Sequence, residues 1–146
     1  MLWLLRHAEA AEGRPDEARP LTARGIDQAR IAGLALARLG VTVESCLSSP
    51  KRRAIETARL ACEPLGVEII TEVALAGSMY DPERLAAGLG ETMLVGHNPS
   101  ISNVLRDMTG ARVHLRKGGV AAVQRGELIL LMTPTELAAI AEVNDG

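Results

Sequence analysis

The chain begins with a short apolar run that ends in two chemically active side chains. Residues 2–10 read Leu2-Trp3-Leu4-Leu5-Arg6-His7-Ala8-Glu9-Ala10. A continuous apolar run of this length is typical of a buried strand. An arginine and a histidine follow where the run ends. The stretch therefore predicts a central strand that presents a cation and a nucleophile at its tip.

Strand patterns and helix patterns alternate along the next hundred residues. Thr22 precedes a segment with apolar residues at helical spacing, so we expect it to be a helix N-cap. Two later strands run directly into proline-led helices, in which we expect Ser49 and Asn98 to be the caps and Pro50 and Pro99 the first helical residues. The strand patterns cover residues 2–5, 43–48, 67–70 and 92–96, and the helix patterns cover residues 22–39, 50–66, 82–89 and 99–110.

The C-terminal part of the chain has a different pattern. Two apolar segments flank residues 124–127, a turn sequence that predicts a β-hairpin and therefore antiparallel strands at one side of the sheet. Thr133 and Glu136 have the spacing of a capping box. We therefore expect a last helix that extends to about Val143.

The alternation of strands and helices defines a fold class. Such chains form a mainly parallel sheet covered by helices on both faces. The sequence therefore predicts an α/β fold, a three-layer α/β/α sandwich with an antiparallel edge, in one domain over residues 1–146. Ligands bind these sheets at the carboxyl ends of the strands. Because Arg6, His7, the segment 48–53 and His97 all follow predicted strands, we expect them to lie at this edge.

The arginines at this edge indicate that it binds phosphate. Arg53 falls in the first turn of a predicted helix, where backbone N–H groups and the helix dipole already favour an anion. Arg6 adds a second guanidinium group, and each group can hold two phosphate oxygens. Neighbouring helical side chains point about 100° apart, so we expect Arg52 and Lys51 to be solvated instead.

A histidine beside a bound phosphate can act as a nucleophile. If an acceptor holds its second ring nitrogen, neutral His7 can attack phosphorus and form a phosphohistidine that water then opens. A cationic His97 would stabilise the charge that develops on the phosphoryl oxygens. The residues alone also allow a metal-binding role for His7 and a purely structural role for His97. We expect His114 to be an ordinary surface or structural residue.

Composition narrows the class of ligand and partner. The chain has a formal net charge of -2, one Trp, one Tyr and no Phe, so it lacks the positive field and the aromatic platforms that nucleic-acid binding uses. No segment has the length of a signal-peptide core or a membrane span, and no histidine, cysteine or carboxylate stands at a recognised metal spacing. We expect a cytoplasmic protein with reduced Cys46 and Cys62, no metal or other cofactor, and no nucleic-acid or membrane partner.

Three short motifs resemble the signatures of a known family. They are Leu5-Arg6-His7-Ala8-Glu9, Ser49-Pro50-x-x-Arg53-Ala54-x-x-Thr57-Ala58 and Val95-Gly96-His97-Asn98-Pro99. In this order and spacing they resemble the histidine phosphatase superfamily, also called the phosphoglycerate mutase-like family, over nearly the whole chain. The resemblance implies that His7 is the phosphorylated nucleophile and that Arg6, Arg53 and His97 complete the phosphate pocket, with Asn98 as a further substrate-binding residue.

Further segments resemble one branch of this family. The short length, Arg19-Pro20-Leu21-Thr22 and Lys117-Gly118-Gly119-Val120 are similar to the SixA branch, the bacterial phosphohistidine phosphatases. Larger members of the superfamily carry a general acid after the third strand, where this chain is short and offers Asp81, with Glu72 just before it. Asp81 before Pro82 also suits a helix N-cap. We favour a site without a dedicated acid.

The expected lack of an acid favours one substrate class. An alkoxide must be protonated as it leaves, whereas phosphohistidine can leave as neutral imidazole, whose reference pKa is about 6.5. We therefore expect hydrolysis of phosphohistidine on a partner protein through a covalent phosphohistidine on His7. Two alternatives stay open, namely a small-molecule phosphomonoesterase with Asp81 or Glu72 as general acid, and a non-catalytic phosphate-binding module.

Overall fold

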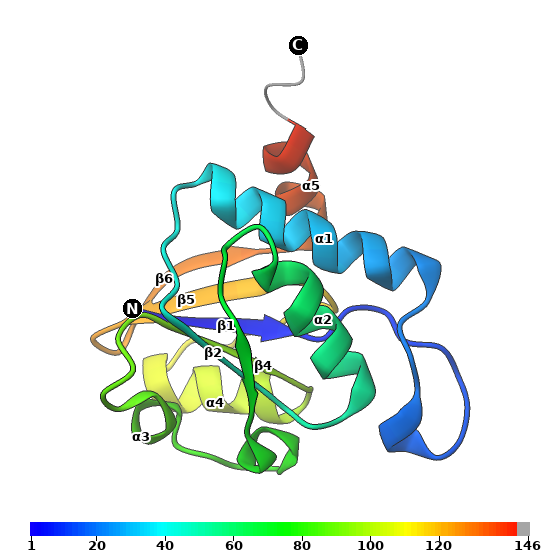
Figure 1. Ribbon diagram of the computed structural model, residues 1–146. Coiled ribbons are helices and arrows are strands. Elements are labelled where there is room, and N and C mark those ends of the chain that lie inside the picture. Colours follow the sequence, from blue (N-terminus) through cyan, green and yellow to red (C-terminus); the bar gives the residue numbers. More distant parts are fainter. Residues whose placement is uncertain (143–146) are drawn as a thin grey trace.

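The computed structural model describes residues 1–142 and places a six-stranded mixed sheet between two layers of helices (Figure 1). The strands are β1 (Leu2–Arg6), β2 (Ser45–Ser48), β3 (Ile69–Thr71), β4 (Thr92–Gly96), β5 (Val120–Gln124) and β6 (Glu127–Met132). The α-helices are α1 (Ala23–Arg38), α2 (Arg52–Cys62), α3 (Pro82–Ala86), α4 (Ser100–Thr109) and α5 (Pro134–Glu142), and the 3-10 turns are η1 (Asp16–Ala18) and η2 (Val73–Ala76).

The sheet is parallel over four strands and antiparallel at one edge. Its order is β3-β2-β4-β1-β5-β6, with β1, β2, β3 and β4 parallel and the hairpin β5–β6 antiparallel. Arg125 and Gly126 form the hairpin turn with φ of 51° and 75°, the left-handed values that a two-residue turn between twisted strands requires. The predicted α/β fold with a mainly parallel sheet and an antiparallel edge is confirmed.

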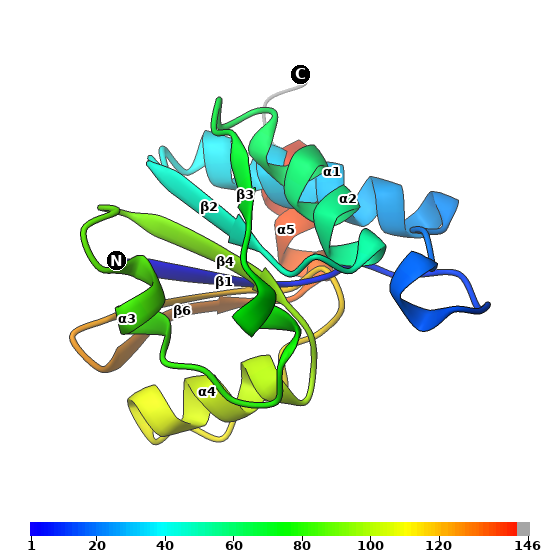
Figure 2. The ribbon, with the colours of Figure 1, turned by 60° about the horizontal axis from the view of Figure 1, so that its bottom comes forward.

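Helices cover both faces of β1, which explains its continuous apolar sequence. Trp3 and Leu5 pack with residues of α1, α2 and α5 on one face, and Leu2 and Leu4 pack with residues of α4 on the other. Figure 2 shows α1, α2 and α5 on one side of the sheet and α3 and α4 on the other. Within residues 1–142, no helix combines the length and hydropathy needed to cross a membrane.

Helix α1 lies close to α2 because Gly33 has no side chain. A Cβ atom at Gly33 would collide with the carbonyl oxygen of Ala61. The close contact holds α2 against the sheet, and the first turn of α2 carries Arg53.

Some element boundaries differ from the expected ones. Thr22 is the N-cap of α1, as predicted, and its side chain accepts a hydrogen bond from the N–H of Gly25 at 3.0 Å. Helices α2 and α4 begin two and one residues later than predicted, at Arg52 and Ser100, because Pro50 and Pro99 belong to the turns that leave β2 and β4. The end of the last predicted helix, Val143, lies outside the described residues.

Candidate active site

The carboxyl ends of three neighbouring strands bring the predicted histidines together. Strand β4 lies between β1 and β2, and the hydrogen bonding continues past the strand ends. The N–H of His7 donates to the carbonyl of Gly96 at 3.0 Å, and the N–H of Ser49 donates to the carbonyl of Val95 at 3.0 Å. The rings of His7 and His97 consequently lie with their centroids 5.1 Å apart.

His7 is held in a single tautomer by the backbone. Its Nδ1 lies 2.8 Å from the carbonyl oxygen of Ala8, and because a carbonyl only accepts, Nδ1 carries the proton. Burial lowers the pKa of His7 to about 4; the bond to Ala8 opposes this shift, and the nearby cations Arg53, Arg6 and Lys117 add to it. At neutral pH the ring is therefore uncharged and Nε2 carries a lone pair.

His97 is buried to the same extent but has a different partner. Its Nε2 lies 2.7 Å from Oγ of Ser49, a hydroxyl that can donate or accept. Burial, together with the charges of His7, Arg53 and Lys51, lowers the pKa of His97 to about 3, and Asp16 opposes this shift. The structure thus makes His97 neutral at pH 7, whereas the sequence-based hypothesis used a cation. A bound dianion would raise this pKa by favouring the charged ring.

Arg53 is buried and held by an aspartate that the sequence did not single out. Its Nη1 donates to the backbone carbonyl of Asp16 at 2.9 Å, and its Nη2 donates to Oδ2 of Asp16 at 3.2 Å. The same carboxylate accepts from Arg19 at 3.0 Å and from Lys51 at 3.2 Å. Hydrogen bonds from Arg19, Lys51 and Arg53 hold the pKa of Asp16 well below its usual range. The turn η1 is therefore fixed to the first turn of α2.

The two cations beside Arg53 behave differently from each other. Lys51 is partly exposed and also binds Asp16 through its ammonium group. Arg52 is exposed and pairs with Glu56 one turn further along α2 at 3.0 Å, as expected for a solvated helix face.

A buried threonine connects the loop after β1 to α2. The N–H of Ala8 donates to Oγ1 of Thr57 at 3.0 Å, and this hydroxyl donates to the carbonyl of Arg53 at 2.7 Å. Thr57 is completely buried. The backbone beside the ring of His7 is thereby fixed relative to the helical turn that carries Arg53.

Arg6 and Asn98 share one backbone acceptor. Nη1 of Arg6 and Nδ2 of Asn98 donate to the carbonyl of Leu115 at 3.1 and 3.0 Å. Oδ1 of Asn98 accepts from the hydroxyl of Ser102 at 2.6 Å and from its N–H at 3.3 Å. These contacts give Asn98 a positioning role; the substrate contact expected for it from the sequence stays a prediction.

Two buried polar atoms at this edge have no partner. Among the side chains of the described residues, the buried atoms that lack a hydrogen bond are Nε of Arg6, Nδ1 of His97 and Oη of Tyr80. Buried polar atoms are nearly always paired, so unpaired atoms on Arg6 and His97 indicate groups that bind a ligand. With two arginines and two histidines, the site can hold a tetrahedral oxyanion beside the lone pair of His7. Within residues 1–142, no group of three histidines, cysteines or carboxylates could hold a metal ion.

Comparison with known sequences identifies the family. The model of the histidine phosphatase superfamily (branch 1) matches residues 2–81, more than half of the chain. This chain belongs to the histidine phosphatase superfamily. An uncharacterized protein of Picosynechococcus sp. is 30% identical to this histidine phosphatase over 158 aligned residues, which cover 91% of this chain and 96% of the relative.

Solved structures share the fold of this histidine phosphatase. The structure of the protein histidine phosphatase SixA complexed with tungstate has a TM-score of 0.79 and 23% identity, and the match covers 93% of this chain and 98% of that one. The alpha-ribazole phosphatase of Shigella flexneri has a TM-score of 0.71 and 19% identity, with 91% and 96% covered. At these identities the likeness shows the common fold.

The two candidate acids of this histidine phosphatase both cap helical turns. Oδ1 of Asp81 accepts from the N–H groups of Glu83 and Arg84 at 3.1 and 3.3 Å, at the start of α3. Oε2 of Glu72 accepts from the N–H of Ala74 at 3.1 Å, at the start of η2. Each carboxylate is thus already bound to backbone N–H groups at the start of a helical turn.

Sequence reasoning missed Asp16 as a part of this site, and it missed the contact of Ser49 with His97. Asp16 lies in a polar loop, and its one signal is that the loop leaves β1 at the edge where the cations lie. Ser49 was interpreted as a helix cap, and its Oγ does accept from the N–H of Lys51 at 3.2 Å. That same atom also contacts His97, a contact which needs the strand order β2-β4 to be known. His114 is exposed, in agreement with the prediction of a surface residue.

Proposed function

We propose that this histidine phosphatase hydrolyses phosphohistidine on a partner protein, through a covalent phosphohistidine on His7. The observation that carries the proposal is the bond from Nδ1 of His7 to the carbonyl of Ala8. It keeps the proton on Nδ1, and the lowered pKa keeps the ring neutral at pH 7. Nε2 is therefore a nucleophile over the whole physiological pH range.

The proposed reaction has two displacements at phosphorus. In the first, the lone pair of Nε2 of His7 forms a bond to phosphorus while the P–N bond of the substrate breaks and its electron pair returns to the substrate nitrogen. In the second, water attacks the phosphoryl group, releases inorganic phosphate and returns the electron pair to Nε2. Arg6 and Arg53 bind the phosphoryl oxygens throughout, and His97 stabilises the charge that builds up on them.

The hydrogen bonds of the carboxylates of Asp81 and Glu72 support a substrate with a P–N bond. Substrate histidine leaves as neutral imidazole once its second nitrogen carries a proton, so no acid is required. Asp81 and Glu72 each accept backbone N–H groups at a helix start. The structural likeness to SixA, a protein histidine phosphatase crystallised with the tetrahedral anion tungstate, supports the same class of substrate.

A small-molecule phosphomonoesterase is the second candidate function. The fold is also that of an alpha-ribazole phosphatase, and such an ester substrate would need an acid for its leaving oxygen. Asp81 or Glu72 would then have to give up its capping bonds to reach the leaving oxygen.

Comparison of a P–N with a P–O substrate tests the proposal. We expect kcat/KM for phosphoramidate to exceed that for an alkyl phosphate such as glycerol 3-phosphate by about 100-fold, since the alkoxide needs an acid to leave and removal of that need is worth about that factor. Asp81→Asn and Glu72→Gln should leave phosphoramidate turnover unchanged. Preference for the ester, with a large loss in Asp81→Asn or Glu72→Gln, would establish the phosphomonoesterase instead. Binding of tungstate without turnover of either compound would establish the phosphate-binding module.

A further inference from the structure

A short basic segment lies beside the proposed phosphate site and has no role in the chemistry. It consists of residues 112–117, Arg112-Val113-His114-Leu115-Arg116-Lys117. Leu115 is completely buried and anchors the segment, because its carbonyl accepts from Arg6 and Asn98 and its N–H donates to Oγ of Ser102 at 3.0 Å. The residues on either side of Leu115, His114 and Arg116, are exposed. The segment is thus fixed to the ends of β1 and β4 with its charges in solvent.

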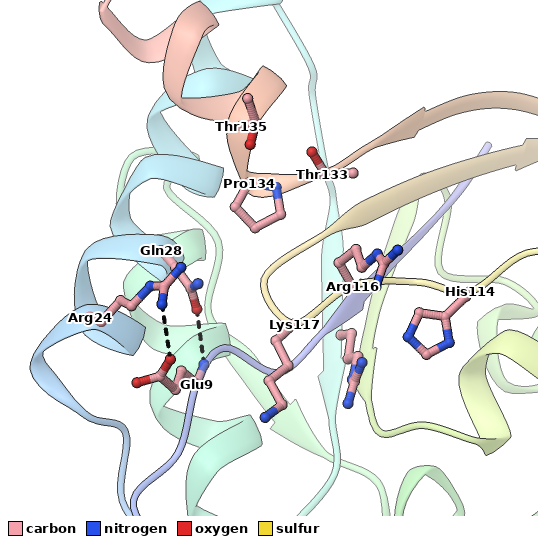
Figure 3. A pocket seen from close by; sticks show the side chains of 10 residues that line it. Glu9, Arg24, Gln28, His114, Arg116, Lys117, Thr133, Pro134 and Thr135 are labelled. Carbon is pink, nitrogen blue, oxygen red and sulfur yellow. Dashed lines mark hydrogen bonds and ion pairs between the residues drawn. The ribbon is translucent and has the colours of Figure 1, made fainter.

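A cavity lies on one side of this basic segment, between it and the starts of α1 and α5 (Figure 3). It has a volume of about 600 Å³, and its cationic lining residues are Arg6, Arg24, Arg116 and Lys117. Glu9 is the single carboxylate among the described residues that line it, and its charge is compensated by Arg24 at 3.7 Å. The cavity therefore carries an excess of positive charge.

A second cavity lies on the other side of the basic segment, against α4. It has a volume of about 470 Å³ and is lined by Arg106, Arg112, His114 and Asn98 together with small and apolar residues. No carboxylate occurs among the described residues that line it. The two cavities together extend the positive charge from Arg6 to a point beyond Asn98.

Cavities elsewhere on the molecule do not share this charge. Among the described residues that line one of about 390 Å³, Arg125 is the one cationic side chain and Glu83 the one carboxylate, beside the N-terminal residue Met1. Another of about 250 Å³ has the carboxylates Asp81 and Asp107 and no cation among its described lining residues. The chain as a whole has a formal net charge of -2. Positive charge is therefore concentrated beside the candidate active site and is not a general property of the surface.

We infer that the basic segment and the two cavities beside it form a docking surface for an acidic face of the protein that carries the phosphohistidine. The inference rests on the proposed function. His7 is only 7% exposed. A phosphorylated side chain that reaches it must therefore bring the surrounding surface of its own protein against the basic segment and the two cavities. Lys117 of the basic segment is one of the cations that lower the pKa of His7, so this segment and His7 are within electrostatic range of each other. Complementary charge across such an interface accelerates encounter and selects the partner.

Nucleic acid fits this surface less well than an acidic protein. No tryptophan, tyrosine or phenylalanine occurs among the described residues that line either cavity, so the surface offers no platform for stacked bases. Gln28, Thr133 and Thr135 of the first cavity and Asn103 of the second are short polar groups suited to carboxylates as well as to phosphates.

Two synthetic peptides test the inference on the intact protein. Each carries one histidine phosphorylated with phosphoramidate, flanked at the same positions by glutamates in one peptide and by lysines in the other. We expect wild type to hydrolyse the glutamate peptide with a kcat/KM about tenfold or more above that of the lysine peptide at low ionic strength, mainly through a lower KM. The preference should shrink at high ionic strength because salt screens exposed charges.

A charge-reversed pair of variants locates the effect. Arg24→Glu/Arg112→Glu removes one cation from each cavity, and both side chains are exposed. Arg30→Glu/Arg59→Glu makes the same change in net charge on exposed positions of α1 and α2 that line neither cavity. We expect the first variant to reduce the peptide preference to about twofold or less while phosphoramidate turnover stays at the wild-type rate, and the second to change neither quantity.

The outcomes separate this inference from the proposed function. Equal turnover of the two peptides, or an equal effect of the two double variants, would overturn the docking surface while leaving the proposed activity in place. Tighter binding of a single-stranded oligonucleotide than of the glutamate peptide, lost in Arg24→Glu/Arg112→Glu, would replace the acidic protein by a nucleic acid. Failure of wild type to hydrolyse phosphoramidate would instead remove the proposed function itself.

Discussion

His7 and His97 follow neighbouring parallel strands and are both 7% exposed, yet they are anchored in opposite ways. His7 is bound through Nδ1 to a backbone carbonyl, which fixes its proton, whereas His97 is bound through Nε2 to the hydroxyl of Ser49, which can donate or accept. Burial lowers the pKa of both rings. This difference indicates that His7 is held in one tautomer, as a nucleophile requires. The ring of His97 can gain or lose a proton as charge develops next to it.

The largest expected effect comes from removing the ring of His7, which is held in one tautomer. His7→Ala should reduce kcat/KM for phosphoramidate by about 10⁴-fold or more, because it removes the proposed nucleophile. Steady-state phosphate release measures this loss. His114→Ala is the matched control, since it removes an exposed histidine from the neighbouring basic segment, and it should retain full activity. Undiminished turnover by His7→Ala would show that the nucleophile is elsewhere.

Removal of the second ring should be less severe. His97→Ala should lose about 100- to 1000-fold in kcat, the usual cost of one stabilising group at a developing oxyanion, and it should still form a phosphoenzyme at a reduced rate. Rapid-quench labelling measures that rate. A loss equal to that of His7→Ala, with no phosphoenzyme formed, would reverse the roles that the comparison assigns.

The hydroxyl that distinguishes His97 from His7 can be removed by itself. Ser49→Ala leaves Nε2 of His97 without its partner at 2.7 Å and should lower kcat about tenfold, since a buried ring nitrogen without a partner costs about 1–3 kcal/mol. Binding of tungstate, measured by calorimetry, should weaken by a smaller factor. A kcat within twofold of wild type would show that the hydroxyl does not position His97.

A separate effect, which leaves the reaction aside, concerns stability as a function of pH. The pKa values in the folded protein, about 4 for His7 and about 3 for His97, lie below the ordinary histidine value of 6.5, so the unfolded chain binds protons first as the pH falls. Stability should be constant above pH 6.5 and should decrease as the pH falls towards 4, by up to roughly 3 kcal/mol for each ring.

Urea unfolding at a series of pH values measures this dependence. The decrease should be shallower in His7→Gln and His97→Gln, each of which removes one titrating ring. A stability that rises as the pH falls below 6.5 would contradict the lowered pKa values.

The predictable parts of this site are those that depend on local sequence. Arg6 and His7 follow an apolar run, and Arg53 follows a serine and a proline, so the strand tip and the first helical turn could be located from the pattern alone. The capping role of Thr22 was equally local. These features depend on a few consecutive residues, for which side-chain chemistry and backbone preference act together.

The parts that could not be predicted depend on contacts between distant segments. Asp16 reaches Arg53 across 37 positions, and Arg6 reaches the carbonyl of Leu115 across 109. A backbone carbonyl has no sequence signature, so the shared acceptor of Arg6 and Asn98 was invisible. The charge of His97 depends on distant segments in the same way, because its pKa is set by burial and by neighbours from other elements.

The most direct test of the account is to identify the atom that becomes phosphorylated. The protein would be mixed with phosphoramidate, quenched in alkali and examined by peptide mapping and phosphorus NMR. The hydrogen bond from Nδ1 of His7 to Ala8 predicts an acid-labile phosphoryl group on Nε2 of His7, absent from His7→Ala. Phosphate on Nδ1 of His7, on His97 or on a carboxylate, or turnover with no trapped intermediate at any time point, would contradict the account.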